Sequence, residues 1–168
     1  LPVRRLQIVL ASPLPRHWCG GDAFRTALFN ALSMSFPVGE QFFIDSVRSG
    51  LKMLPDADRA RFADEVQGFV GQEATHRRLH ALFNAHLARA GFRNDIEPRA
   101  IKRLAANAHR DPRVHVAATA ATEHFTAIFA NCPRYIPQMA LVEPSVYVPH
   151  ADEAPVEPAW KAFDIFSD

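Results

Sequence analysis

Glu73 and His76 have the spacing that best suits metal chemistry in this 168-residue chain. They lie three positions apart in a helical pattern that runs from about Asp56 to Ala90, so their side chains share one helix face. A Glu-x-x-His unit is the recurrent ligand pair of dimetal helical bundles. His80 lies on the same face, one turn further along. The other residues of this face are apolar: Phe62, Val66, Phe69, Phe83 and Leu87.

Because this face is apolar at both ends, we expect it to be buried, and a buried carboxylate is costly unless it is paired. Two further helical patterns carry an acid, Glu40 or Glu123, within an apolar stripe. Three acids that meet in a dry interior repel one another and raise one another's pKa. Two divalent cations bridged by carboxylates would relieve that repulsion. The ligands predicted on helices are Glu40, Glu73, His76 and Glu123.

Several of these residues also have a structural explanation. Taken alone, Glu40 could be a boundary residue whose carboxylate reaches water. His80 is better explained as a supporting or surface residue than as a ligand. His124 adjoins Glu123 but points roughly 100° away from it on a helix, which favours a hydrogen-bonding role. The Glu73–His76 pair carries most of the metal hypothesis, and the sequence has no second Glu-x-x-His unit to match it.

Hydrophobic periodicity predicts an all-α protein with one domain over residues 1–168 and a helical core over 21–131. Phe36-Pro37 is expected to end a helix, because proline has no N–H and disfavours helix in the residue before it. The helix that starts near Ile96 is expected to turn Ile101 inward. The expected helices span 22–34, 38–53, 56–90, 96–109 and 112–130.

Residues 132–168 contain six prolines, a density that excludes a long helix. We therefore expect an irregular C-terminal segment. The segment holds further potential ligands, among them His150 and Glu153. The chain begins with Leu1 and stops two residues after Phe166, and we expect it to be a fragment of a longer protein.

Composition excludes several classes of function. The formal net charge is +1 and basic residues are dispersed, which argues against nucleic acid or an anionic membrane surface as a partner. The longest apolar runs fall far short of the roughly 20 residues of a membrane span. No secretory signal is recognisable at the start. Cys19 and Cys132 lie far apart in the sequence and have no CxxC partner, so we expect both to be free thiols. We expect a cytoplasmic protein with a small-molecule substrate, and a homodimer stays open.

Three blocks, Asn30–Ile44, Phe69–His76 and Thr119–Ala127, resemble in order and spacing the bacterial family named "predicted metal-dependent hydrolase". His80 and Asn84 follow the second block as they do in that family. The resemblance covers the chain from Val3 to about Ala130. It implies a ferritin-like helical domain, in the cytoplasm, with a metal site.

The chain departs from the family at the fourth block, whose pattern is similar to W-H-A-x-E-E-x-E-H-K on a helix. Here Pro155 and Pro158 interrupt the helix that would present the ligands. The resemblance therefore implies either that the site is incomplete or that His150 and Glu153 act from a loop.

Three functions follow from these patterns. The first is a metal-dependent hydrolase that uses two divalent ions of iron, manganese or zinc. The second is a non-haem di-iron oxidoreductase, by analogy with other carboxylate-rich helical sites. The third is an inactive helical scaffold, which the interrupted fourth block favours.

Overall fold

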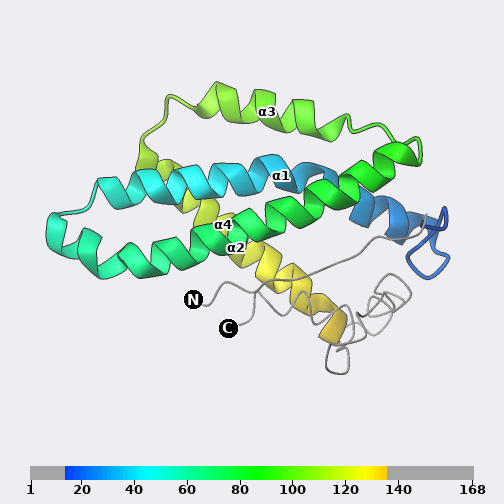
Figure 1. Cartoon of the computed structure of the whole chain (residues 1–168), viewed down its shortest axis with the longest axis horizontal. Helices are drawn as coiled ribbons and strands as arrows, with labels where there is room; N and C mark the ends of the chain where they lie inside the picture. The colour runs from blue at the N-terminus through cyan, green and yellow to red at the C-terminus, as the bar shows by residue number, and fades with distance from the viewer. Residues whose placement is uncertain (1–13, 136–168) are drawn as a thin grey trace. The chain divides into compact units, whose positions relative to one another are not determined.

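The computed structural model describes residues 14–135, and these residues form four helices without a strand. This confirms the all-α expectation. The proline-rich stretch from residue 136 onward lies outside the described residues, and so do the predicted ligands His150 and Glu153. The helices are α1 (Ala23–Lys52), α2 (Asp56–Arg89), α3 (Ile96–Asn107) and α4 (Pro112–Tyr135) (Figure 1).

The helix ends follow local sequence signals. Asp22 precedes α1, and its Oδ1 accepts a hydrogen bond from the Arg25 backbone N–H at 2.8 Å. Asp111 does the same before α4, where its Oδ1 accepts the Arg113 N–H at 2.9 Å. Such side chains satisfy N–H groups that have no partner within the helix. At the other end of α2, Gly91 takes a φ of +89°, the left-handed conformation that stops many helices.

The expected break at Phe36-Pro37 is wrong, because α1 continues as one helix of 30 residues with Pro37 inside it. A proline within a helix leaves the carbonyl four residues earlier without its usual donor. That carbonyl belongs to Ser33, and the side-chain Nδ2 of Asn84 on α2 donates a hydrogen bond to it at 2.9 Å. A tertiary contact therefore replaces the helical hydrogen bond that the proline removes.

The described chain divides into two compact units, and residues Asn30–Ala121 belong to the first. Within that unit α1 and α2 lie side by side and antiparallel (Figure 1). Ser33 near the start of the unit meets Asn84 late in α2, while Gln41 further along α1 accepts a hydrogen bond from Arg77. The residues of α1 and α2 that face each other are therefore fixed along several turns.

The first part of α4 also packs against α1 within this unit. The hydroxyls of Ser46 and Thr119 are 2.7 Å apart and buried. At Gly50 a Cβ would lie only 2.6 Å from Cγ2 of Val116, so the two helices approach closely there.

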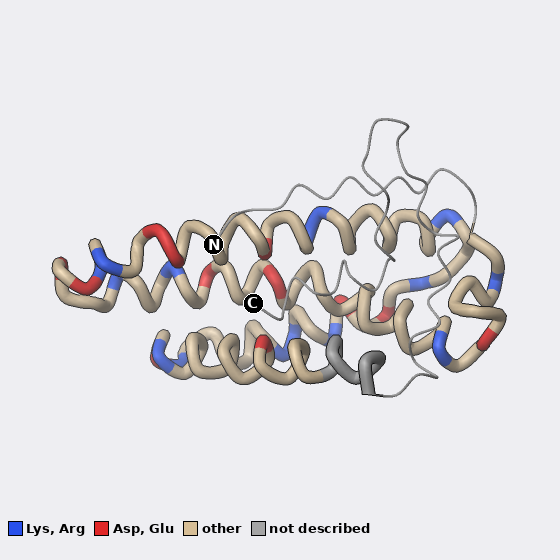
Figure 2. The backbone as a smooth tube through the Cα atoms, turned by 90° about the horizontal axis from the view of Figure 1, so that it is seen from below, with Lys and Arg blue, Asp and Glu red and all other residues tan. Residues whose placement is uncertain are grey.

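Charges are dispersed over the described helices. Figure 2 shows Lys and Arg interspersed with Asp and Glu along the tube rather than gathered on one helix. The apolar length needed to cross a membrane is reached by none of the helices within residues 14–135.

Candidate metal centre

The predicted face of α2 turns inward as its spacing indicates. None of its eight residues is exposed, including the five apolar ones at its two ends. At its centre Glu73 is 2 % exposed and His76 is 8 % exposed. A carboxylate and an imidazole are therefore buried on successive turns of one helix.

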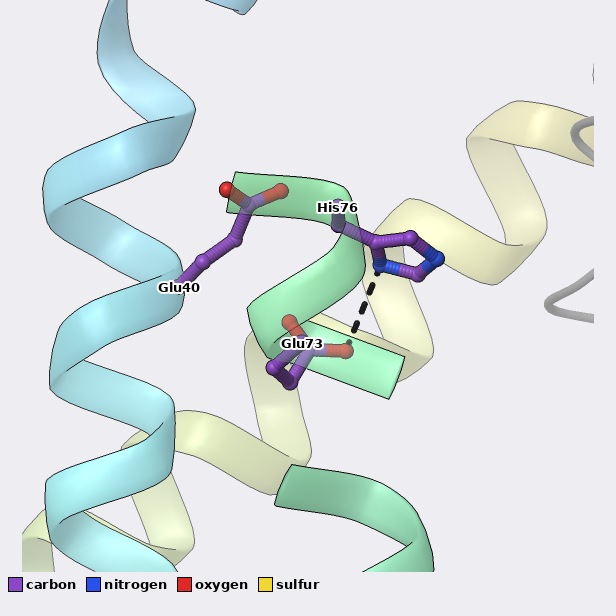
Figure 3. Close-up of side chains that lie close together, drawn as sticks. All are labelled: Glu40, Glu73 and His76. Carbon is purple, nitrogen blue, oxygen red and sulfur yellow. Dashed lines mark ion pairs between the residues drawn. The ribbon is translucent and has the colours of Figure 1, made fainter. Parts of the chain in front are cut away.

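A second carboxylate reaches the same place from α1. Glu40 is 5 % exposed and extends toward α2, as Figure 3 shows. One ligand atom from each of Glu40, Glu73 and His76 lies within 4.8 Å of the other two. Two helices that are distant in sequence thus bring two oxygens and a nitrogen together.

The spacing of these atoms suits a divalent cation. His76 Nδ1 lies 3.4 Å from Glu73 Oε1, the pair marked in Figure 3. Two ligands that each lie about 2.1 Å from one ion are separated by roughly 3.0–4.2 Å, depending on the angle between them. Two buried carboxylates also repel each other, and a bound cation compensates both charges. The Glu73–His76 pair therefore fits a metal ion in distance, and the cluster as a whole fits one in charge.

His80 borders this cluster. Its Nε2 lies 3.7 Å from Glu40 Oε1, and its Nδ1 lies 2.9 Å from the Ser33 hydroxyl. The ring of Phe36 packs edge-on against its imidazole, with the ring centroids 4.7 Å apart. Burial, followed by the charge of nearby His76, lowers the pKa of His80 from 6.5 to about 4.

Three of the predicted metal ligands form this cluster. Glu40, Glu73 and His76 come together, whereas Glu123 lies half-buried on α4 in the second compact unit. Its role as a ligand stays a prediction, and so do the roles of His150 and Glu153.

Two residues that contact the site were given no role by the sequence patterns. Ser33 and Asn84 hydrogen-bond to each other, and Ser33 reaches His80. The available signal was the family resemblance, because Ser33 falls within the block Asn30–Ile44 and Asn84 follows the block Phe69–His76.

A buried carboxylate–histidine cluster between helices is typical of a metal-binding protein. The model of the family described as "Predicted metal-dependent hydrolase" matches residues 2–140 of the chain. The chain belongs to this family, which confirms the resemblance seen in its three sequence blocks. No curated protein and no solved structure matches it.

Proposed function

We propose that this protein hydrolyses a small-molecule substrate with the help of divalent metal held by Glu40, Glu73 and His76. The observation that carries the proposal is the convergence of their ligand atoms within 4.8 Å, in a buried place between α1 and α2. Family membership supports hydrolysis as the reaction class.

When bound, a divalent cation would supply Lewis acidity, lowering the pKa of water and polarising the bond to be cleaved. The chain's own part is to hold the ligands in place and to neutralise the charge of the ion. The surroundings have a lower effective dielectric constant than water, which strengthens the attraction between these carboxylates and a cation. Helices position such groups more firmly than loops do.

We further propose that the site holds two ions of iron, manganese or zinc in a ferritin-like bundle. The order of the acids supports this: Glu40 on α1, Glu73 with His76 on α2, and Glu123 on α4. Dimetal bundles place a single Glu or a Glu-x-x-His unit on successive helices in this manner. We also propose a cytoplasmic location and keep a homodimer as an expectation.

Metal analysis of the full chain, purified without oxygen, tests the proposal. The wild-type protein should carry divalent metal in stoichiometric amount. Glu73→Gln keeps the shape of the side chain but removes its charge, so it should weaken Zn²⁺ binding by about 100-fold or more, beyond the 10–100-fold expected for a supporting residue. Glu65→Gln, an exposed change on the same helix, is the matched control and should leave binding unchanged.

A di-iron oxidoreductase is the second candidate, because two carboxylates and one imidazole make an oxygen-rich ligand set like those of helical di-iron proteins. Two irons per chain with a visible absorption band that depends on O₂ would favour it. Zinc or manganese with a product that forms from water would favour the hydrolase. If the protein binds no metal even after reconstitution, the inactive helical scaffold is the function that remains.

A further inference from the structure

Pro37 determines the orientation of an amide next to the metal centre. Because proline has no N–H, the Ser33 carbonyl takes a hydrogen bond from Asn84 Nδ2 at 2.9 Å instead. A carbonyl can only accept, so the NH₂ group of Asn84 must face it. The oxygen of the same amide therefore points the other way, toward the Ser33 hydroxyl.

The Ser33 hydroxyl then fixes the position of the proton on His80. Its single hydrogen is donated to Asn84 Oδ1 at 2.9 Å. The hydroxyl oxygen also lies 2.9 Å from His80 Nδ1, and with its hydrogen already used it can only accept there. The neutral imidazole of His80 therefore carries its proton on Nδ1 and leaves a lone pair on Nε2.

That lone pair faces the candidate metal centre. His80 Nε2 lies 3.7 Å from Glu40 Oε1, and both atoms are acceptors. The separation is within the roughly 3.0–4.2 Å that two ligands of one cation adopt. In metal sites the second nitrogen of a ligating histidine usually donates to a protein oxygen, which fixes the tautomer and the ring orientation. Nδ1 of His80 makes that bond to Ser33.

We propose that His80 is a further metal ligand, binding through Nε2 beside Glu40, with Ser33 and Asn84 as its positioning residues. This rests on the proposed function, since it extends the same metal site. The ligand set then comprises two carboxylates and two imidazoles from α1 and α2, in which His80 lies outside the 4.8 Å group of Glu40, Glu73 and His76 and adjoins it through Glu40. His80 supplies the second imidazole that the missing Glu-x-x-His unit would have provided.

Nitrogen-15 NMR of the full chain, with and without Zn²⁺, tests the proposal on the unaltered protein. In metal-free protein His80 should show the Nδ1–H tautomer. On adding Zn²⁺, the resonance of its Nε2 should shift together with one ring nitrogen of His76. A shift of His76 without one of His80 would overturn the role of His80 while leaving the proposed function intact. Absence of any zinc binding would overturn both.

Variants give a second measurement. His80→Gln should lower Zn²⁺ affinity by about 100-fold or more. Ser33→Ala and Asn84→Ala should each lower it by about 10–100-fold, the usual effect of removing a residue that supports a ligand. Ser33→Ala should also shift the His80 tautomer toward Nε2–H, which a merely structural role would not do. His109→Gln changes an exposed histidine and should leave affinity unchanged.

An unaltered tautomer in Ser33→Ala, or wild-type affinity in His80→Gln, would contradict the proposal. Circular dichroism and the free energy of unfolding show whether each variant is folded. The NMR experiment on the wild-type chain decides the question if a variant is not.

Discussion

Glu73 has the lowest exposure of the described carboxylates, at 2 %. Its burial matters because a charged group removed from water is tolerated only with a compensating partner. His76 Nδ1, at 3.4 Å, provides one contact, and Glu40 adds a second negative charge rather than relieving the first. At the scale of single residues, a bound cation would therefore stabilise the cluster by compensating its negative charge.

His80 makes the stability of the metal-free protein dependent on pH. Its pKa is lowered to about 4, mainly by burial and further by His76, from 6.5 in an exposed histidine. Between pH 6.5 and 4 the unfolded chain takes up a proton that the folded chain resists. Stability is therefore highest above pH 6.5 and falls as the pH drops toward 4, by at most about 3 kcal/mol from this residue.

Denaturant unfolding of metal-free protein at pH 7 and pH 4.5 measures this effect. His80→Gln cannot titrate, so its loss of stability between the two pH values should be smaller than that of the wild type. Glu40 and His76, which face His80, are present in both proteins, so the variant differs from the wild type only at residue 80. Equal losses in the two proteins would show that His80 is not the group responsible.

At the scale of helices, spacing alone was enough to identify the buried face of α2 that carries Glu73 and His76. Residues three and four positions apart share a face whatever surrounds the helix, so Glu73 and His76 could be predicted together. The continuity of α1 could not be predicted, because the group that compensates Pro37 is Asn84, 51 positions away from Ser33. Ile101 of α3 was expected to turn inward and is 51 % exposed, since a pattern shows which face is apolar but not what covers it.

Replacing Pro37 tests how α1 and the site are linked. Pro37→Ala supplies an N–H for the Ser33 carbonyl and removes an interior proline, which costs about 3 kcal/mol in a helix. Part of that gain is lost through greater freedom of the unfolded chain and through competition with Asn84. We expect the free energy of unfolding of the metal-free protein to rise by about 1–2 kcal/mol while Zn²⁺ affinity falls, because Asn84 loses its fixed orientation.

Pro98→Ala is the matched control for this change. Pro98 lies in the first turn of α3, where a missing N–H removes no bond within the helix. It should alter neither stability nor zinc affinity by a comparable amount. If Pro37→Ala left affinity unchanged, the connection from the proline through Asn84 to the metal centre would be wrong.

At the scale of the whole molecule, the part of the interior that the structure describes holds many polar side chains. Among the described residues, more polar or charged side chains than hydrophobic ones are buried. Apolar burial is the main favourable term in folding, and buried polar groups contribute only when they are well paired. A protein with such an interior depends more heavily on the partners of those groups, and here the central group has the composition of a metal site. The bound ion is thus expected to stabilise the fold as well as to serve the chemistry.

Removing the metal should therefore destabilise the protein in a localised way. A ligand that binds only the folded state adds about 2.7 kcal/mol to its stability when present at 100 times its Kd. Chelation should lower the melting temperature of the wild type by the corresponding amount, and Glu73→Gln should show almost no response.

After chelation, amide hydrogen exchange should accelerate most around Glu40 on α1 and Glu73 on α2. It should change little in α3, which has no buried residue. Uniform acceleration over all helices, or an equal response of Glu73→Gln, would place the stabilising ion somewhere other than between α1 and α2.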